Sequence, residues 1–403
     1  MPNLRQLFLQ HLAPTSDAPL LLEVEKAAGI YLFDPDGKKY IDIISGISVS
    51  SLGHCHPRIV QAIKDQADKF LHTLVYGEFL LSPQVKLATL LTKQLPEKLD
   101  CVYFVNSGSE ATEGAMKLAK RFTGRAEMIA CYNAYHGSTQ GSASLMSETY
   151  FTQPYHPLLP GIHHIEFNEV AHLDRITTKT ACVIVETVQA ESGVTTPKND
   201  YLKKLRQRCD ETGTLLVFDE IQVGYGRTGS LFAFEQFDVV PDILLLAKGM
   251  GGGMPIGAFI ASAKMMKLLS FEPVLGHITT FGGHPVCCAA ALANLEEMLE
   301  GKWISKVKEK EQLFVSLLKH PAIKELRSWG LFMAVDLDSS ELVMSTIKHC
   351  MADGLITDWF LFNDRCLRIA PPLIITEEEI RTACSIILKG LDKAYKTQRS
   401  KDW

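Results

Sequence analysis

The sequence predicts an α/β protein built around a mostly parallel sheet with helices on both faces. Strand-like apolar segments alternate with helical segments through the middle of the chain, which is typical of parallel sheets. The strand-like segments are nearly continuous in apolar residues, as burial on both faces requires. Several of them end in a charged side chain, including Asp219 and Lys248, at the position where open α/β sheets bind ligands.

The first expected element is a hairpin at residues 31–42, where two apolar runs flank Pro35-Asp36-Gly37. Strands are expected at residues 101–105, 127–131, 181–186, 215–219 and 243–247. Helices are expected between them at residues 109–123 and 199–211. The first of these helices has acidic residues in its first turn, basic residues in its last turn and Gly124 just beyond, which is typical of helix ends.

The sequence changes character after Pro285, where charged amphipathic segments predict a second, smaller domain. Helices are expected at residues 289–299, 304–318 and 376–395, with an extended segment at residues 331–336. A length of 403 residues also favours two domains over one. The predicted divisions are an N-terminal segment (1–55) that packs on the small domain and on a partner subunit, a large domain (56–300) and the small C-terminal domain (301–403).

The composition argues against several classes of protein. The chain has 41 basic and 46 acidic residues, a formal charge of −5, and no basic stripe that would attract nucleic acid or an anionic membrane surface. No apolar run approaches the roughly 18 residues of a bilayer span, and the N-terminus lacks the pattern of an export signal. The ten cysteines are scattered without a C-x-x-C pair, so we expect a reduced, soluble, cytoplasmic protein.

Lys248 and Asp219 indicate a particular chemistry. Each ends an apolar run, so both are expected at the same edge of the sheet. A lysine that loses its proton can attack a carbonyl group, and a carboxylate can pair with a heteroaromatic nitrogen. These are the two groups that a pyridoxal phosphate enzyme needs. Carboxylates at strand ends also occur as solvated groups or helix caps, so Asp219 alone leaves a structural role open.

Two loop segments could complete such a site. Ser107-Gly108-Ser109 opens a helix, where free N–H groups bind anions and a glycine lets a phosphate approach the main chain. Tyr135-His136-Gly137 follows the next strand, and its aromatic ring could lie against a bound pyridine. A capped helix start without a ligand and an aromatic loop packed on the core remain alternatives. A metal site is not expected, because the histidines lack the spacing of a ligand pair.

Five motifs together resemble the class III (ω-)aminotransferases, a family of fold type I pyridoxal phosphate enzymes. The motifs lie at residues 104–111, 135–137, 219–229, 247–249 and 280–285. The resemblance covers residues from about 31 to 372 and is closest overall to the acetylornithine and ornithine aminotransferase branch. It implies a large cofactor-binding domain with a mostly parallel seven-stranded sheet between helices, and a smaller α/β C-terminal domain.

The resemblance implies a role for each matching residue. Lys248 would hold the cofactor as an imine and later move a proton at the substrate carbon, and Asp219 would pair with the ring nitrogen. The other cofactor contacts would come from Ser107, Gly108 and Ser109 at the phosphate, Tyr135 stacked on the ring and Gln222 near the ring hydroxyl, and His136 would be a further cofactor-binding residue. Thr280 matches a threonine that reaches the phosphate in the neighbouring subunit, which implies a homodimer with active sites at the subunit interface.

Two further matches concern the substrates. Arg368 resembles the family arginine that binds the α-carboxylate of glutamate or another α-amino acid, a task that suits a planar donor. Glu191 resembles the glutamate that pairs with this arginine when the substrate presents an ω-amine, so it would act as a switch. Two positions depart from the family pattern. Ser138 stands where acetylornithine, ornithine and 4-aminobutyrate aminotransferases usually have an arginine for a substrate carboxylate, and His284 replaces the usual asparagine.

The resemblance implies a transaminase that moves an amino group from an ω-amino or diamino acid to an α-keto acid such as 2-oxoglutarate, in two half-reactions. The same scaffold also hosts aminomutases, racemases, a decarboxylase and phospho-lyases, and these remain the alternative. Arg368 together with Glu191 favours transamination over them. A non-catalytic or NAD-binding α/β protein is disfavoured, because no G-x-G-x-x-G follows an early strand and because such folds need no lysine at the position of Lys248.

Overall fold

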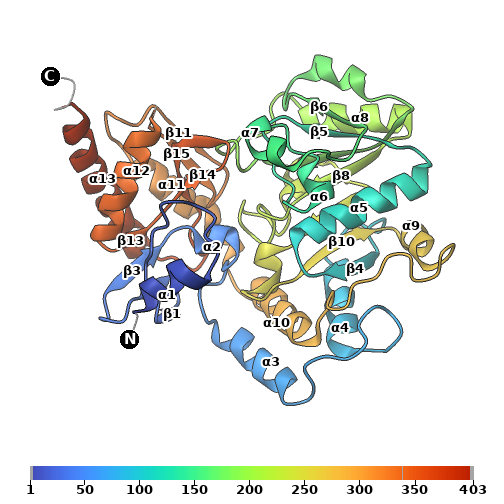
Figure 1. Ribbon diagram of the computed structural model, residues 1–403, viewed down its shortest axis with the longest axis horizontal. Helices are drawn as coiled ribbons and strands as arrows, with labels where there is room; N and C mark the ends of the chain where they lie inside the picture. The colour runs from blue at the N-terminus through green and yellow to red at the C-terminus, as the bar shows by residue number, and fades with distance from the viewer. Residues whose placement is uncertain (1–2, 338, 400–403) are drawn as a thin grey trace.

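The computed structural model describes residues 3–337 and 339–399. Within these residues, the largest sheet has seven strands in the order β4-β10-β9-β8-β7-β5-β6, and it occupies the right half of Figure 1. The strands are β4 (Cys101–Val105), β5 (Glu127–Cys131), β6 (Ile162–Ile165), β7 (Thr180–Glu186), β8 (Leu215–Asp219), β9 (Ile243–Leu246) and β10 (Gly257–Ala261). Only β10 runs antiparallel to its neighbours in this sheet. The predicted α/β fold with a mostly parallel sheet is confirmed.

Helices cover both faces of this sheet, and the strand residues divide between two apolar cores. Cys182 and Ile184 of β7 pack in the core that contains α5 (Gly108–Thr123). Val183 and Val185 point the other way and pack in the core that contains α8 and α10. The bounds of these two helices are Tyr201–Thr212 and Pro285–Glu300. Burial on both faces explains why the strands are continuous in apolar residues.

The C-terminal part forms a smaller sheet with helices beside it, on the left of Figure 1. Its strand order is β11-β12-β15-β14. The strands are β11 (Glu325–Ser328), β12 (Met333–Asp336), β14 (Trp359–Phe360) and β15 (Asn363–Ile369). The helices are α11 (Val307–Leu317), α12 (Ser340–Ala352) and α13 (Glu377–Arg399). Helix α12 packs against both α13 and β15, and its buried apolar side chains belong to the same core that contains Val183 and Val185 of the large sheet.

The N-terminal segment joins the C-terminal part through a third sheet. Its order is β1-β2-β3-β13, and β3 pairs in parallel with β13. The strands are β1 (Lys26–Ala28), β2 (Tyr31–Phe33), β3 (Lys39–Asp42) and β13 (Leu355–Ile356). The hairpin predicted at residues 31–42 is present, with Tyr31 opposite Ile41. The divisions at 55/56 and 300/301 stay predictions, and residues 1–2 and 400–403 of the outer segments lie outside the described residues.

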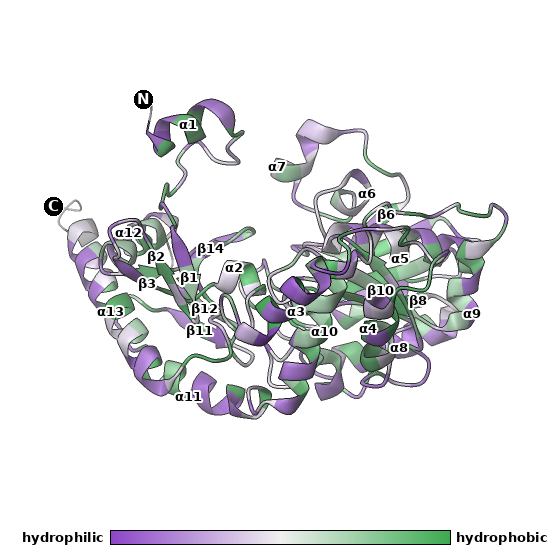
Figure 2. Ribbon diagram, turned by 90° about the horizontal axis from the view of Figure 1, so that it is seen from below, coloured by the Kyte–Doolittle hydropathy of each residue, from purple (hydrophilic) through white to green (hydrophobic). Residues whose placement is uncertain are grey.

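The remaining helices are short or lie at the periphery. The α-helices are α1 (Leu4–His11), α2 (Ser45–Ser48), α3 (Pro57–Ala67), α4 (Ser82–Thr92), α6 (Gln140–Ala143), α7 (Thr149–Thr152) and α9 (Ala263–Met266). The 3₁₀ turns are η1 (Gln153–Tyr155), η2 (Val170–Arg175), η3 (Ala233–Gln236), η4 (Lys248–Gly251), η5 (Lys267–Ser270) and η6 (Ile304–Lys306). Figure 2 shows α1 standing clear of the body. Among the described helices, none has the length and apolar character needed to cross a bilayer.

Several boundaries differ from the prediction for local physical reasons. Helix α10 begins at Pro285, four residues early, because proline suits the first helical turn and His284 Nδ1 accepts the N–H of Val286 at 3.3 Å. Helix α8 begins late, because Asn199 and Asp200 have φ of 52° and 56°, outside the helical region. Strands β6 and β10 were not anticipated.

Candidate active site

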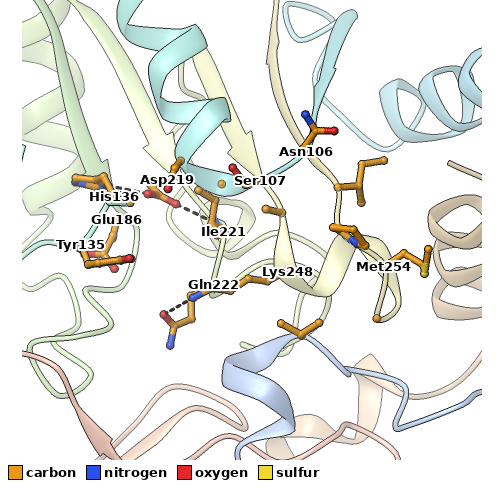
Figure 3. Close-up of a pocket in the computed structure, with 18 residues that line it drawn as sticks. Asn106, Ser107, Tyr135, His136, Glu186, Asp219, Ile221, Gln222, Lys248 and Met254 are labelled. Atoms are coloured by element: carbon orange, nitrogen blue, oxygen red, sulfur yellow. Dashed lines mark hydrogen bonds and ion pairs between the residues drawn. The ribbon is translucent and has the colours of Figure 1, made fainter. Parts of the chain in front are cut away.

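A cavity of about 400 Å³ opens at the carboxyl ends of the parallel strands of the large sheet. Figure 3 shows side chains from separate loops converging on it. It is lined by Val49, Asn106, Ser107, Gly108, Ser109, Tyr135, His136, Gly137, Glu186, Asp219, Ile221, Gln222, Ala247, Lys248, Gly253, Met254, Pro255 and Ile256. Eight of the eleven residues that the sequence analysis placed in the site belong to this lining. The exceptions are Thr280, Glu191 and Arg368.

Lys248 enters the cavity from the turn that follows β9. Its φ of 45° lies in the left-handed region, which is uncommon for a side chain other than glycine and occurs often at functional sites. The amine donates a hydrogen bond to Gln222 Oε1 at 3.0 Å, as Figure 3 shows. Burial lowers the pKa of Lys248, and nearby Glu191 opposes this change. The geometry therefore presents an amine that loses its proton more readily than a solvated lysine.

Asp219 ends β8 beside β9 and is held by two contacts. Its Oδ1 accepts the N–H of Ile221 at 3.0 Å, and its Oδ2 lies 2.7 Å from His136 Nδ1. Both Asp219 and His136 are buried. In the described part of the chain, His136 Nε2 has no hydrogen-bond partner. The structure thus pairs His136 with the acid, a contact that the sequence did not indicate because the two residues are 83 positions apart.

Glu186 ends β7 and lies in the same cavity, although it was not among the predicted site residues. It accepts the backbone N–H of Ala190 at 3.0 Å and that of Tyr135 at 3.4 Å. Burial and the neighbouring charge of Asp219 raise the pKa of Glu186 well above its usual range. Glu186 therefore ties the loop that carries Tyr135 to the segment that leads to Glu191. Its place at a strand end, shared with Asp219, marks it in the sequence as a second acid at this edge of the sheet but does not indicate its role.

The loop before α5 forms a narrow cradle. Ser107 caps the helix and accepts the N–H of Glu110 at 3.2 Å. The first N–H groups of an α-helix have no partner within the helix, so they can bind an anion. Gly108 packs closely, since a Cβ there would come within 2.8 Å of Ile221. Gly137 has a φ of 123°, and a Cβ there would come within 2.3 Å of Ser109 Oγ. Gly137 therefore requires glycine, whereas a side chain at Gly108 would have to displace the end of the Ile221 side chain.

Glu191 and Arg368 form a buried ion pair beside the cavity. Nη1 and Nη2 of Arg368 donate to the two carboxylate oxygens of Glu191, each at 2.9 Å. The side chains of Arg368 and Glu191 are 3% and 7% exposed, respectively. The pair lowers the pKa of Glu191 despite burial and raises that of Arg368, so both stay charged. The predicted partners are thus in contact although 177 positions separate them.

Thr280 lies away from this cavity. It is exposed, and its carbonyl oxygen contacts His72 Nε2 at 2.8 Å.

Ser138 is also exposed, and its backbone N–H donates to Ser109 Oγ at 3.2 Å. Three cations that could in principle replace the family's arginine at this position have other partners: Arg58 pairs with Glu296 and Glu300, Lys117 contacts His277, and Arg125 donates to the carbonyl oxygen of Thr180. Ser138 therefore has no cationic substitute among these three residues.

The arrangement combines an amine, an acid, an aromatic side chain and an anion cradle around one cavity. These are the groups that the sequence predicts for a pyridoxal phosphate site. Among the described residues, no group of three or more His, Cys, Asp or Glu side chains could hold a metal ion.

Comparisons with known proteins identify the chain's relatives. The family model described as aminotransferase class-III matches residues 12–391. An acetylornithine aminotransferase from Methanocaldococcus jannaschii is 38% identical over 96% of each chain. The structure of ornithine aminotransferase from Toxoplasma gondii, in which PLP partially occupies the active site, matches with a TM-score of 0.91 and 31% identity over 97% of this chain and 94% of that one. Acetylornithine aminotransferase from Elizabethkingia anophelis matches with a TM-score of 0.84 and 32% identity over 96% and 98% of the two chains.

Proposed function

Because this chain belongs to the class III aminotransferases, we propose that it uses pyridoxal phosphate to transfer an amino group from an ω-amino or diamino acid to an α-keto acid. Relatives named for acetylornithine and ornithine support a donor of that kind, and 2-oxoglutarate is the proposed acceptor. One observation carries the proposal. The amine of Lys248 and the carboxylate of Asp219 lie at neighbouring strand ends in one cavity.

The residues of the cavity fit pyridoxal phosphate. Gln222 Nε2 and His136 Nε2 are buried without a hydrogen-bond partner in the described residues, so polar groups are available for a ligand. Ser107, Gly108 and Ser109 would hold the phosphate at the start of α5. When bound, the cofactor supplies an aldehyde for the amine and an electron sink for the substrate carbon.

The proposed chemistry assigns distinct tasks to the side chains. Lys248 would accept and return a proton at the substrate carbon through Nζ, which its lowered pKa favours. Gln222 would orient that amine through the hydrogen bond at 3.0 Å. Asp219 would place a negative charge at the ring nitrogen, and its two contacts keep the carboxylate in one orientation. Tyr135 would cover the ring and exclude water.

A panel of separate half-reactions tests the function. Cofactor-loaded protein would be mixed with acetylornithine, ornithine, lysine, 4-aminobutyrate, β-alanine or a simple amine while the absorbance of the bound cofactor is followed. We expect conversion to the amino form of the cofactor with at least one ω-amine, and return to the starting spectrum with 2-oxoglutarate. A cofactor spectrum that no donor changes would contradict the proposed reaction.

Replacing Arg368 by alanine should raise the Michaelis constant for the keto acid far more than that for an ω-amine donor. The bidentate contact is one that a substrate carboxylate could take over, and charged hydrogen bonds of this kind correspond to roughly 10- to 100-fold in affinity. Steady-state kinetics with each substrate varied in turn measures the two constants. Arg368→Lys keeps the charge without the bidentate geometry, so its Michaelis constant for the keto acid should lie between those of the wild type and Arg368→Ala. Arg381→Ala, on the exposed face of α13, is the control. Equal increases for both substrates would refute the switch.

The active unit is proposed to be a homodimer. Large apolar side chains are exposed around the α3–α4 loop and on the segment that carries Thr280, and such patches are typical of interfaces. They are Leu71, Phe79, Leu80, Val274, Leu275, Ile278 and Phe281. Thr280 itself would reach the cofactor phosphate of the other subunit. Sedimentation should give twice the mass of one chain.

A cytoplasmic location is also proposed, and the ten free cysteines support it.

A further inference from the structure

A second acid, Asp358, contacts Arg368 on the edge opposite Glu191. Asp358 Oδ1 lies 3.0 Å from Arg368 Nε, whereas Glu191 binds Nη1 and Nη2. The contact with Asp358 is an ion pair without the alignment of a hydrogen bond. One arginine is therefore shared by two carboxylates, and each carboxylate occupies a different edge of the guanidinium.

Asp358 is held in place by the strand pairing around it. It directly precedes β14, and its carbonyl oxygen accepts the backbone N–H of Arg368 at 2.9 Å. The Asp358 side chain thus comes from the same hairpin as the arginine, whereas Glu191 comes from the loop after β7. Two other contacts on Arg368 also come from this hairpin. Nη2 donates to the carbonyl oxygen of Trp359 at 2.9 Å, and the guanidinium lies 4.4 Å from the centre of the Phe360 ring.

The contacts of Arg368 with Asp358, Trp359 and Phe360 do not involve Glu191, so Glu191 can leave the arginine without breaking them. Within the described residues, the Glu191 side chain hydrogen-bonds to Arg368 and to the backbone N–H of Leu361, at 2.8 Å, and its charge also acts on Lys248. Withdrawal of Glu191 would leave the Nη1 edge of a buried arginine exposed to the substrate. A buried charge that loses its partner is costly, and a remaining counter-ion offsets that cost. Asp358 is the carboxylate that stays.

We propose that Asp358 is a positioning residue, which holds the Nε edge of Arg368 and balances its charge while Glu191 is exchanged for a substrate carboxylate. This inference rests on the proposed transaminase function. It goes beyond the switch formed by Glu191 and Arg368, because it adds a third residue, Asp358, that stays bound to the arginine throughout. Asp358 acts only through Arg368, so it affects the half-reaction that uses the arginine. The amine half-reaction proceeds with Glu191 still bound to Arg368, and it does not depend on Asp358.

The state of Asp358 agrees with this role. Burial raises the pKa of Asp358 to about 6, Arg368 opposes the change, and the like charge of Glu191 adds to it. Asp42, which lies 2.8 Å from His54, is a further acid that acts on Asp358. Asp358 is charged above this pKa and protonated below it. Its support for the exchange is therefore present at neutral pH and is lost as the pH falls through about 6.

The test compares Asp358→Asn with the wild type in the cofactor-loaded dimer. Glutarate, an unreactive dicarboxylate, is the binding probe, and calorimetry gives its dissociation constant. We expect Asp358→Asn to weaken glutarate binding and to raise the Michaelis constant for 2-oxoglutarate by about tenfold. The amine half-reaction should change by less than about twofold. Asp358→Glu restores the charge and should bring glutarate binding back to within about threefold of the wild type. Asp364→Asn, exposed on β15, removes the same charge without contact to Arg368 and is the control.

Three results would overturn the proposal: unchanged glutarate binding in Asp358→Asn, equal losses in both half-reactions, or equal defects in the Asn and Glu variants. A pH series on the wild type and Asp358→Asn adds a second measurement, because glutarate itself takes up a proton in acid. Glutarate binding by the wild type should weaken more than that by Asp358→Asn as the pH falls through about 6, and parallel profiles would contradict the role. Failure of the proposed function is recognised separately, because the wild type would then convert no amine donor at all.

Discussion

Replacing Lys248 by alanine should abolish transamination and the covalent capture of pyridoxal phosphate. The amine lies in the cavity, donates to Gln222 at 3.0 Å and has a lowered pKa, which are the properties of a nucleophile and proton carrier. Loss of both roles should lower turnover by at least about 10³-fold. Turnover assays and the absorbance of the bound cofactor, before and after borohydride, measure the two effects.

The matched control is Lys264→Ala, because Lys264 is an exposed lysine of α9 on the same domain. Its activity and cofactor spectrum should equal those of the wild type. A Lys248→Ala protein that still traps the cofactor with borohydride, or that retains a substantial rate, would remove the central assignment.

Replacing Asp219 by asparagine should leave cofactor binding largely intact and remove most of the rate. An asparagine can keep both contacts, with its oxygen accepting from Ile221 and its amide donating to His136 Nδ1. It carries no charge, so it cannot stabilise a protonated ring nitrogen. Removal of one preorganised electrostatic contact of this kind corresponds to roughly 10²- to 10³-fold in turnover. Half-reaction rates and cofactor titration distinguish the chemical step from binding.

Asp238→Asn is the control for this change. Asp238 has a side chain that is 84% exposed and a φ of 52°, a conformation that asparagine tolerates. It should behave as the wild type. An Asp219→Asn enzyme with a normal rate would show that the acid does not act on the cofactor ring. Loss of cofactor binding together with the rate would instead assign Asp219 to binding.

Local patterns in the sequence were sufficient for much of the large domain. The strands at residues 101–105, 127–131 and 215–219 have the predicted bounds, because each is a short, mainly apolar run. Strand β10 was missed although it is a short apolar segment, and its antiparallel direction follows from its pairing with β4 and β9, which composition does not determine. Helix starts were displaced where a cap such as His284, or left-handed residues such as Asn199, decided the boundary.

The candidate site was predictable where a residue follows directly from its own element. Lys248 and Asp219 end strands, and Ser107 and Gly108 open a helix, so the strand-to-helix order brings them to one edge of the sheet. Val49 and residues 253–256 also line the cavity. Their position does not follow from a strand end or a helix start, so the sequence did not indicate it. Asp358 also carried no signal, because its role depends on a 3.0 Å approach to an arginine that Glu191 already occupies.

The amino-acid sequence alone determined which groups are available and at which edge of the sheet they gather, since periodicity and strand ends are properties of short segments. It also identified the family, through five motifs in the right order. Only the tertiary structure decided which of these groups touch: His136 with Asp219, Lys248 with Gln222, and Arg368 between two acids. Contacts between residues 83 or 177 positions apart depend on how the layers pack. The packing energy comes from many side chains across the molecule, so no single segment of the sequence determines it.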